Sequence, residues 1–261
     1  MVAALPVAVI VVVLFGGAVV TAAATTVRDP AGRWTLDVWR EVLADPALMD
    51  AVWFSLRTTL AVTVLSAALA VPIAAGVRNR LWTKAVSVVP LVIPHLTVAV
   101  LAVLWVGPGG LADRLLGGLP LQMIRDRAGI GIVAVYVIKE VPFLVLLVTA
   151  AWGEATRERE EAAAVLGAGL VTRFRFVTWP AIRLPLVTGA LIVAAFVLGA
   201  FEVPLVVGPS YPPTLATLAF EQTRAPDLAG GARAAAILLL ATGLTLLLAG
   251  IAARTARRHD A

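Results

Sequence analysis

Six apolar runs, separated by short polar segments, make up most of this chain. Each run holds about 20 residues, and a helix of that length crosses roughly 30 Å of hydrocarbon. The pattern therefore predicts an all-α integral membrane protein with six transmembrane helices, forming a single domain over residues 1–261. The expected spans are residues 3–24, 51–76, 85–106, 129–152, 184–207 and 232–253.

The first run ends in Ala22-Ala23-Ala24, a small-residue sequence of the kind that is cleaved after a secretion signal. No Lys or Arg precedes this run, and its apolar stretch is longer than a signal core. We therefore expect an uncleaved span. The alternative is a cleaved signal followed by five spans.

Composition agrees with a membrane protein. With 61% apolar and 14% charged residues, the chain is too hydrophobic for a soluble domain. The absence of cysteine excludes disulfides, thiolate metal sites and Cys nucleophiles. The net charge of +5 comes from basic residues in short loops between the apolar runs, so it indicates membrane orientation and no nucleic-acid partner.

The loop charges predict which side of the membrane each loop occupies. If the N-terminus is cytoplasmic, eleven Lys and Arg residues lie in the inside loops and seven in the outside loops. The first run argues the other way, since Arg28 follows it and no basic residue precedes it. The positive-inside rule then places the chain in the plasma or inner membrane with both termini cytoplasmic.

The charged segment between the fourth and fifth runs, residues 154–180, is the most informative part of the sequence. The runs on either side hold almost no charge, so this segment is predicted to be a loop in water. Its glutamates favour the start of a short helix, because acidic side chains stabilise a helix N-terminus. Gly167 and Gly169 allow the left-handed residue that ends such a helix.

A second short helix is predicted in the same loop. Val171, Phe174 and Val177 recur every three residues, which is the spacing of an apolar stripe on a helix. Pro180 is then expected to restart the chain at the membrane surface.

The loop contains a spaced pattern: Glu161, Ala162, Ala163, three residues, Gly167, nine residues, Val177, one residue, Trp179 and Pro180. This pattern resembles the EAA loop of permease subunits in binding-protein-dependent ABC importers, which reads EAA, three residues, Gly, nine residues, Ile-x-Leu-Pro. Val177 stands in place of the Ile and Trp179 in place of the Leu. Both replacements are apolar, so we expect the docking surface to be kept.

The resemblance covers most of the chain and implies the transmembrane domain of a type-1 ABC importer. In that family two permease subunits, identical or different, form the translocation path, two ATPase subunits bind beneath them, and an extracytoplasmic binding protein delivers substrate. The EAA loop forms a coupling helix that sits in a cleft of the ATPase. The resemblance assigns this contact to Glu161, Ala162, Ala163, Gly167, Phe174, Val177 and Pro180. ATP and Mg²⁺ would be bound by the partner ATPase, with no cofactor in this chain.

Two prolines four residues apart, Pro90 and Pro94, are expected to kink or break the third span. Such a break is tolerated where protein or a cavity satisfies the freed carbonyls. His95 either lines the translocation path or is a satisfied interior histidine, and we favour the second interpretation.

Lys139 and Glu140 lie deep in the fourth run, where each charge costs about 2.5–3.5 kcal/mol, so both should face protein or water. Neighbours on a helix point about 100° apart, so the two are not expected to face one narrow cavity. We expect them to pair with other spans or with a partner subunit. Lining of the translocation path is the alternative.

Glu202, two residues before Pro204, also lies in an apolar run. It either contacts a cationic substrate in the path, or caps a helix broken by Pro204, or pairs with a basic residue such as Lys139. Glu202, Glu140 and His95 are thus the candidate translocation-path residues. The sixth run shows no polar feature in this interpretation.

Between the first two runs, an amphipathic helix is expected along the outer membrane surface. Its apolar face would be formed by Trp34, Val38, Trp39 and Val42, which fall on one side of a helix.

The chain lacks the residues of a catalyst. Neither Lys84 nor Lys139 stands in a Walker A loop, and no H-E-x-x-H or G-x-S-x-G motif occurs. We therefore expect no enzymatic activity in this chain, and ATP hydrolysis in a separate subunit. An integral-membrane enzyme is disfavoured for the same reason.

Two segments of the sequence bear on the substrate. The FEVPLVVG and YPPTL segments resemble permeases of the polyamine, ferric iron, thiamine and phosphonate group. A polyamine is the first choice, because Glu140 and Glu202 could meet a cation. The alternative class is an ion-gradient-driven secondary transporter or channel, with Lys139, Glu140 and Glu202 as an ion or proton relay.

Overall fold

The computed structural model describes residues 12–29, 31–77, 89–118 and 122–257, which are almost wholly helical. Among these residues, extended pairing is limited to one bridge between Arg28 and Trp34. The all-α prediction is therefore confirmed. In chain order the elements, with η for a π-helical turn, are η2 Val12–Gly16, α2 Gly17–Thr26, α3 Asp37–Ala44, α4 Pro46–Val77, α6 His95–Val106, α7 Leu111–Leu116, α8 Ile130–Ala151, α9 Glu154–Val165, α10 Leu170–Arg173, η3 Phe174–Thr178, α11 Trp179–Gly199, α12 Glu202–Val207, α13 Leu215–Thr223 and α14 Gly230–Arg257.

Five helical segments of the described chain are long and apolar enough to cross a membrane. They are Pro46–Val77, His95–Leu116, Ile130–Ala151, Leu170–Gly199 and Gly230–Gly250. The first expected span, residues 3–24, lies partly outside the described residues, and its later part forms η2 and the short apolar helix α2. The count of six spans therefore stays a prediction.

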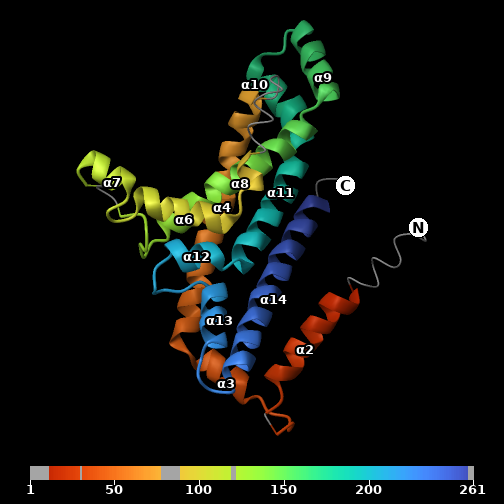
Figure 1. Ribbon diagram of the computed structural model, residues 1–261. Helices are drawn as coiled ribbons and strands as arrows, with labels where there is room; N and C mark the ends of the chain where they lie inside the picture. Colours follow the sequence, from red (N-terminus) through yellow and green to blue (C-terminus); the bar gives the residue numbers. More distant parts are fainter. Residues whose placement is uncertain (1–11, 30, 78–88, 119–121, 258–261) are drawn as a thin grey trace.

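The long helices form an elongated bundle from which α6 and α7 reach sideways (Figure 1). Helices α9 and α10 lie at one end of the bundle and α3 at the opposite end, and we call these the α9 end and the α3 end. The main apolar core lies where α4, α8 and α11 pack together, and it includes Phe54, Val62, Tyr136, Leu144, Ile182 and Val193. A second apolar cluster at the α3 end joins α3, α4, α13 and α14.

The start of α4 is fixed by two residues. Asp45 precedes the helix and accepts a hydrogen bond from the N–H of Ala47 at 2.9 Å, which satisfies one free donor of the first turn. Pro46 occupies the first helical position, where its missing N–H costs nothing. The helix therefore begins five residues before the predicted residue 51. The fourth span was predicted to within one residue at each end, since α8 covers Ile130–Ala151.

The amphipathic helix before the second span is present, but its apolar face contacts protein. Val38 and Val42 of α3 are buried in the cluster with α13 and α14. The indole N–H of Trp39 donates to the hydroxyl of Thr26 at 3.1 Å, which ties α3 to the end of α2. Trp34 lies outside α3 and is exposed, so its predicted place on the apolar face is wrong.

The fifth span differs from the prediction at both ends. A continuous helix runs from Leu170 to Gly199, so there is no separate second loop helix and Pro180 does not restart the chain. The π-turn η3 accounts for this continuity, because it places an extra residue in the helix just before Pro180 and shifts the hydrogen-bond partners.

The helix ends at Gly199 because of Pro204. A proline lacks an N–H, and its ring would clash with the carbonyl of Ala200, four residues earlier. Pro204 instead occupies the third position of α12, where no intrahelical donor is needed. The predicted span to residue 207 is therefore wrong.

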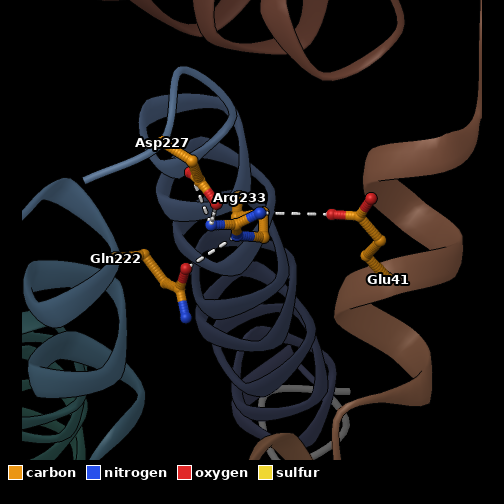
Figure 2. Close-up of polar contacts among 4 residues, drawn as sticks. All are labelled: Glu41, Gln222, Asp227 and Arg233. Atoms are coloured by element: carbon orange, nitrogen blue, oxygen red, sulfur yellow. Dashed lines mark hydrogen bonds and ion pairs between the residues drawn. The ribbon is translucent and has the colours of Figure 1, made fainter. Parts of the chain in front are cut away.

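The sixth span is not featureless, because Arg233 in the first turn of α14 joins three elements (Figure 2). Its guanidinium donates to the side chain of Gln222 at 2.8 Å and to both carboxylate oxygens of Asp227 at 2.7 Å. It also lies 3.2 Å from the carboxylate of Glu41 on α3. A single side chain therefore holds α3, α13 and α14 together at the α3 end.

Candidate functional site

The loop at the α9 end begins with a helix whose end is well defined. Gly167 has φ +84°, the left-handed conformation that glycine adopts most readily. The N–H of Ala168 donates to the carbonyl of Ala163, and the N–H of Gly167 donates to the carbonyl of Ala164, each at 2.9 Å. This pair of bonds is a Schellman motif, so the prediction that Gly167 ends the helix is confirmed. Gly169 has φ −68° and begins α10 instead.

The tip of the loop exposes apolar side chains. Two apolar residues before Gly167 and two after it are each between 77% and 88% exposed: Val165, Leu166, Leu170 and Val171. The segment lies beyond the packed part of the bundle (Figure 1). Contiguous apolar surface of this kind, set in a charged segment, marks a protein contact. We call these four residues the apolar tip.

The residues assigned to coupling from sequence lie in α9, at Gly167, in η3 and at the start of α11. Glu161, Ala162, Gly167, Phe174 and Pro180 are exposed, and Ala163 and Val177 are half-buried. The coupling residues expected from sequence did not include Val165, Leu166 or Leu170. The signal that could have identified them was the pairs of apolar residues beside a glycine in a charged loop.

The acidic side of α9 is ordered by one arginine. Arg157 lies 2.6 Å from the carboxylate of Glu154 and 3.6 Å from that of Glu161. The hydrogen bond with Glu154 and the charges around it raise the pKa of Arg157. On this face of α9 the carboxylates of Glu154 and Glu161 are therefore both paired with Arg157.

The middle of the bundle holds a polar site where the third span is broken. Residues 89–92 are helical, the helix stops at Ile93 and Pro94, and α6 begins at His95. Lys139 of α8 donates to the carbonyl of Ile93 at 2.6 Å and to the carbonyl of Pro90. The carbonyl freed by Pro94, which is that of Pro90, is therefore satisfied by protein, one of the two expected ways, while the residue four before Pro90 lies outside the described residues.

Glu140 contacts the same broken helix. Its carboxylate Oε1 lies 2.9 Å from Nε2 of His95, so the two form a hydrogen-bonded pair between α8 and α6. The His95 ring also packs against Phe196 of α11, with ring centroids 4.7 Å apart. His95 is therefore half-buried and hydrogen-bonded, and it also lines a pocket, so both interpretations of this histidine stay open.

Both charged residues of α8 line one pocket of about 230 Å³. The expectation that they do not face one narrow cavity is therefore wrong, because the long lysine side chain bends toward the break in the third span. The lining residues are Leu91, His95, Lys139, Glu140, Phe143, Ile192, Val193 and Phe196.

Glu202 lies apart from this pocket. It is the first residue of α12, and its Oε2 accepts a hydrogen bond from the N–H of Phe201 at 3.1 Å. This local contact corresponds to the capping alternative, while Lys139 is engaged with backbone carbonyls of the third span. The structure therefore brings His95 and Glu140 together and leaves Glu202 outside their pocket.

Comparisons with known proteins agree on one class. The family model described as "Binding-protein-dependent transport system inner membrane component" matches residues 63–259. The inner membrane ABC transporter permease protein YnjC of Escherichia coli strain K12 is 29% identical over 234 residues, which cover 86% of this chain. The chain spans 45% of the length of YnjC. The molybdenum transport system permease protein ModB of Mycobacterium tuberculosis is 29% identical over 223 residues, covering 82% of each chain.

Solved structures show the same architecture. The crystal structure of a bacterial ABC transporter that imports the acidic polysaccharide alginate has a TM-score of 0.76 and 18% identity, covering 97% of this chain and 93% of that chain. The alginate transporter in complex with an alginate pentasaccharide-bound periplasmic protein has a TM-score of 0.79 and 16% identity. At this identity the likeness shows the fold, which is the expected transmembrane fold of a type-1 ABC transporter.

Proposed function

We propose that this chain, which belongs to the family of binding-protein-dependent transport system inner membrane components, forms half of the translocation path of an ABC importer. In this proposal a second permease subunit supplies the other half. Separate ATPase subunits bind and hydrolyse ATP with Mg²⁺, and an extracytoplasmic binding protein delivers the substrate. The alginate transporter, solved with its periplasmic protein, supports the last partner.

The observation that carries the proposal is the apolar tip at the end of a charged loop. Val165, Leu166, Leu170 and Val171 are largely exposed there, and the helix before them ends at the left-handed Gly167. The tip projects away from the bundle, so an ATPase can receive it in a cleft (Figure 1). The loop would then lie in the cytoplasm, as the positive-inside count predicts, with both termini on the same side.

Coupling follows from how the loop is joined to the spans. Helix α9 follows α8 after Gly153, and α10 continues through η3 into α11. The backbone therefore joins the apolar tip directly to two spans. Closure of the ATPase dimer on ATP would rotate these spans and open the path to alternate sides.

We further propose that the pocket with His95 and Glu140 faces the translocation path. The carboxylate of Glu140 and the ring of His95 are the polar groups that a solute in this pocket would meet, beside Lys139. Glu202, outside the pocket, would contribute to the path from the start of α12. The polyamine substrate expected from sequence gains no support from the named relatives, one of which transports molybdenum and another alginate.

The test is purification of the chain from its native membrane, with mass spectrometry of the proteins that accompany it. An ATP-binding subunit and a second permease are the expected partners. Leu166→Asp in the apolar tip should remove the ATPase from the complex, since a charge cannot enter an apolar contact without cost. The matched control is Leu228→Asp, which changes an equally exposed leucine, 91% accessible, between α13 and α14.

A chain that purifies without an ATPase and transports with an ion gradient would overturn the proposal in favour of a secondary transporter. Equal retention of the ATPase by both aspartate variants would show that the apolar tip is not the docking surface.

A further inference from the structure

Helix α9 contacts the rest of the molecule along one narrow strip. Its buried residues are Thr156 and Glu160, and Ala163 is half-buried. These positions follow one another at spacings of four and three, which puts them on one face of the helix. Every other residue of α9 is exposed. A helix with so little apolar contact is held to its neighbours by whatever polar bonds this strip makes.

Glu160, at the middle of the strip, makes those bonds to two different spans. Its Oε1 accepts a hydrogen bond from the indole N–H of Trp152 at 2.9 Å and another from the hydroxyl of Thr178. Trp152 is the residue that ends α8, and Thr178 is the last residue of the π-turn that leads into α11. All three side chains are buried, with exposures of 8% or less. One carboxylate oxygen therefore joins α9, α8 and the start of α11.

Such a contact fixes position better than apolar packing does. Hydrogen bonds to an ionised acceptor are shorter, stronger and more directional than contacts between neutral groups. The shielding of the site from water strengthens them further. Apolar surfaces can slide past one another, whereas α9 can shift relative to Trp152 and Thr178 only by breaking or dragging these bonds.

We propose that Glu160 is a positioning residue for coupling, whose carboxylate makes α8 and α11 move together with α9. The proposal rests on the proposed function, because it assigns to Glu160 the transfer of ATPase motion from the loop to the spans. Glu160 does not touch the ATPase or the substrate. It acts through Trp152 and Thr178.

The absence of cysteine from the chain allows a direct test. Spin labels on cysteines introduced at Ile73 of α4 and Val187 of α11, both on exposed faces, report the distance between these spans in the complete complex. The distance distribution is recorded without nucleotide and with ATP and Mg²⁺. The same samples are assayed for ATPase retention, ATP hydrolysis and thermal stability.

In the wild type, ATP should shift the distance distribution. Removal of one charge-assisted hydrogen bond changes an equilibrium by about tenfold. Glu160→Ala removes two such bonds, so we expect it to reduce the fraction of complexes that shift with ATP by at least about tenfold, while the ATPase stays bound and hydrolyses ATP. Glu160→Gln should recover part of the shift, because its amide oxygen can accept both bonds. Glu158→Ala, which removes an exposed carboxylate from the same helix, is the matched control and should behave as the wild type.

Two further variants keep the test decisive if Glu160→Ala reduces the amount of protein. Trp152→Phe and Thr178→Val each remove one donor while nearly conserving side-chain volume. Each should reduce the ATP-driven shift. When either is combined with Glu160→Gln, the loss should be smaller than the sum of the two single losses, because residues in contact do not act independently.

The outcomes separate the two proposals. A normal ATP-driven shift in Glu160→Ala, or in both donor variants, overturns the role of Glu160 and leaves the importer assignment intact. Absence of any ATPase from the wild-type complex overturns the proposed function, and the role of Glu160 with it.

Discussion

The ammonium group of Lys139 donates to the carbonyl of Ile93 at 2.6 Å, in the gap that Pro94 opens between two helical segments. A lysine in an apolar span is costly unless its charge is satisfied. Here the carbonyls solvate the ammonium charge, and the ammonium group supplies the donor that the carbonyls lack. The broken helix and the buried lysine therefore depend on one another.

Lys139→Met should therefore lower stability by about 1–3 kcal/mol, because it leaves buried carbonyl groups without a donor. Thermal unfolding of the purified protein in a lipid nanodisc measures this loss. The matched control is Ile138→Met, which changes the exposed neighbour of Lys139. Equal unfolding temperatures for the two variants would contradict the interpretation of the lysine as a partner of the broken helix.

His95 and Glu140 should show energetic coupling. Their side chains join α6 to α8 through one contact at 2.9 Å. Residues in direct contact typically couple by about 0.5–3 kcal/mol in a double-mutant cycle. We expect His95→Ala and Glu140→Ala together to cost less than the sum of the two single changes. Additive losses of stability would argue that the pair contributes nothing beyond its separate members.

Gly167→Ala should weaken binding of the ATPase without removing the spans from the membrane. A side chain at φ +84° strains the backbone by about 1–2 kcal/mol, although no atom lies within 4 Å of the added methyl group. The loop will relieve this strain by moving the apolar tip. Co-purification of the ATPase measures the effect.

Gly169→Ala is the control for that experiment. Gly169 has φ −68°, and its added methyl group also meets nothing within 4 Å. This variant should bind the ATPase as the wild type does, and an equal loss in both variants would show that backbone conformation at Gly167 is not the cause.

Arg233→Gln should loosen the α3 end. The variant loses the ion pair to Asp227, in the loop before α14, and the ion pair to Glu41, which links α14 to α3 (Figure 2). Hydrogen exchange of the α3 peptide, which the ion pair to Glu41 holds in place, should become a few-fold faster. Arg224→Gln is the control, because Arg224 is exposed and lies over the ring of Phe220. Unchanged exchange in α3 would mean that apolar packing alone holds this helix.

The same network predicts a pH dependence. The hydrogen bond from Arg233 lowers the pKa of Asp227 below its ordinary value of 3.8. A lowered pKa means that the bond stabilises the fold fully above pH 3.8 and is lost as the pH falls through the lowered value. The difference in unfolding temperature between the wild type and Arg233→Gln should therefore be constant from pH 7 to pH 5 and shrink below 3.8. A difference that shrinks already at pH 6 would assign the effect to another group.

Local patterns in the sequence predicted the helices and their chemical breaks. Gly167 was placed correctly because the left-handed conformation is a property of one residue. The need to satisfy the carbonyls freed by Pro90 and Pro94 was also predictable from backbone chemistry. The donor was not, because the contact between Lys139 and Ile93 depends on how α8 packs against a segment 46 residues earlier.

The errors have a similar cause. The span ending at residue 207 followed from apolar composition, which does not register the clash between Pro204 and Ala200. Pro180 was expected to break the chain, but a π-turn absorbs it. The role of Arg233 in the sixth run was missed because its partner Glu41 lies 192 residues earlier in the chain. Glu160 was interpreted as one of several acids at a helix start, and only the packed structure separates it from its exposed neighbours.

The π-turn at Phe174–Thr178 keeps the loop and the fifth span in one continuous helix, which can act as a lever. Because the helix does not stop at Pro180, 30 residues from Leu170 to Gly199 form one rod, roughly 45 Å long at the helical rise. Tilting a rod of that length by about 5° displaces its far end by about 4 Å, which exceeds the width of a carbon atom. A slight rocking of the loop in water is thereby magnified into a displacement at the Gly199 end of the rod, next to α12 and about midway along the bundle (Figure 1).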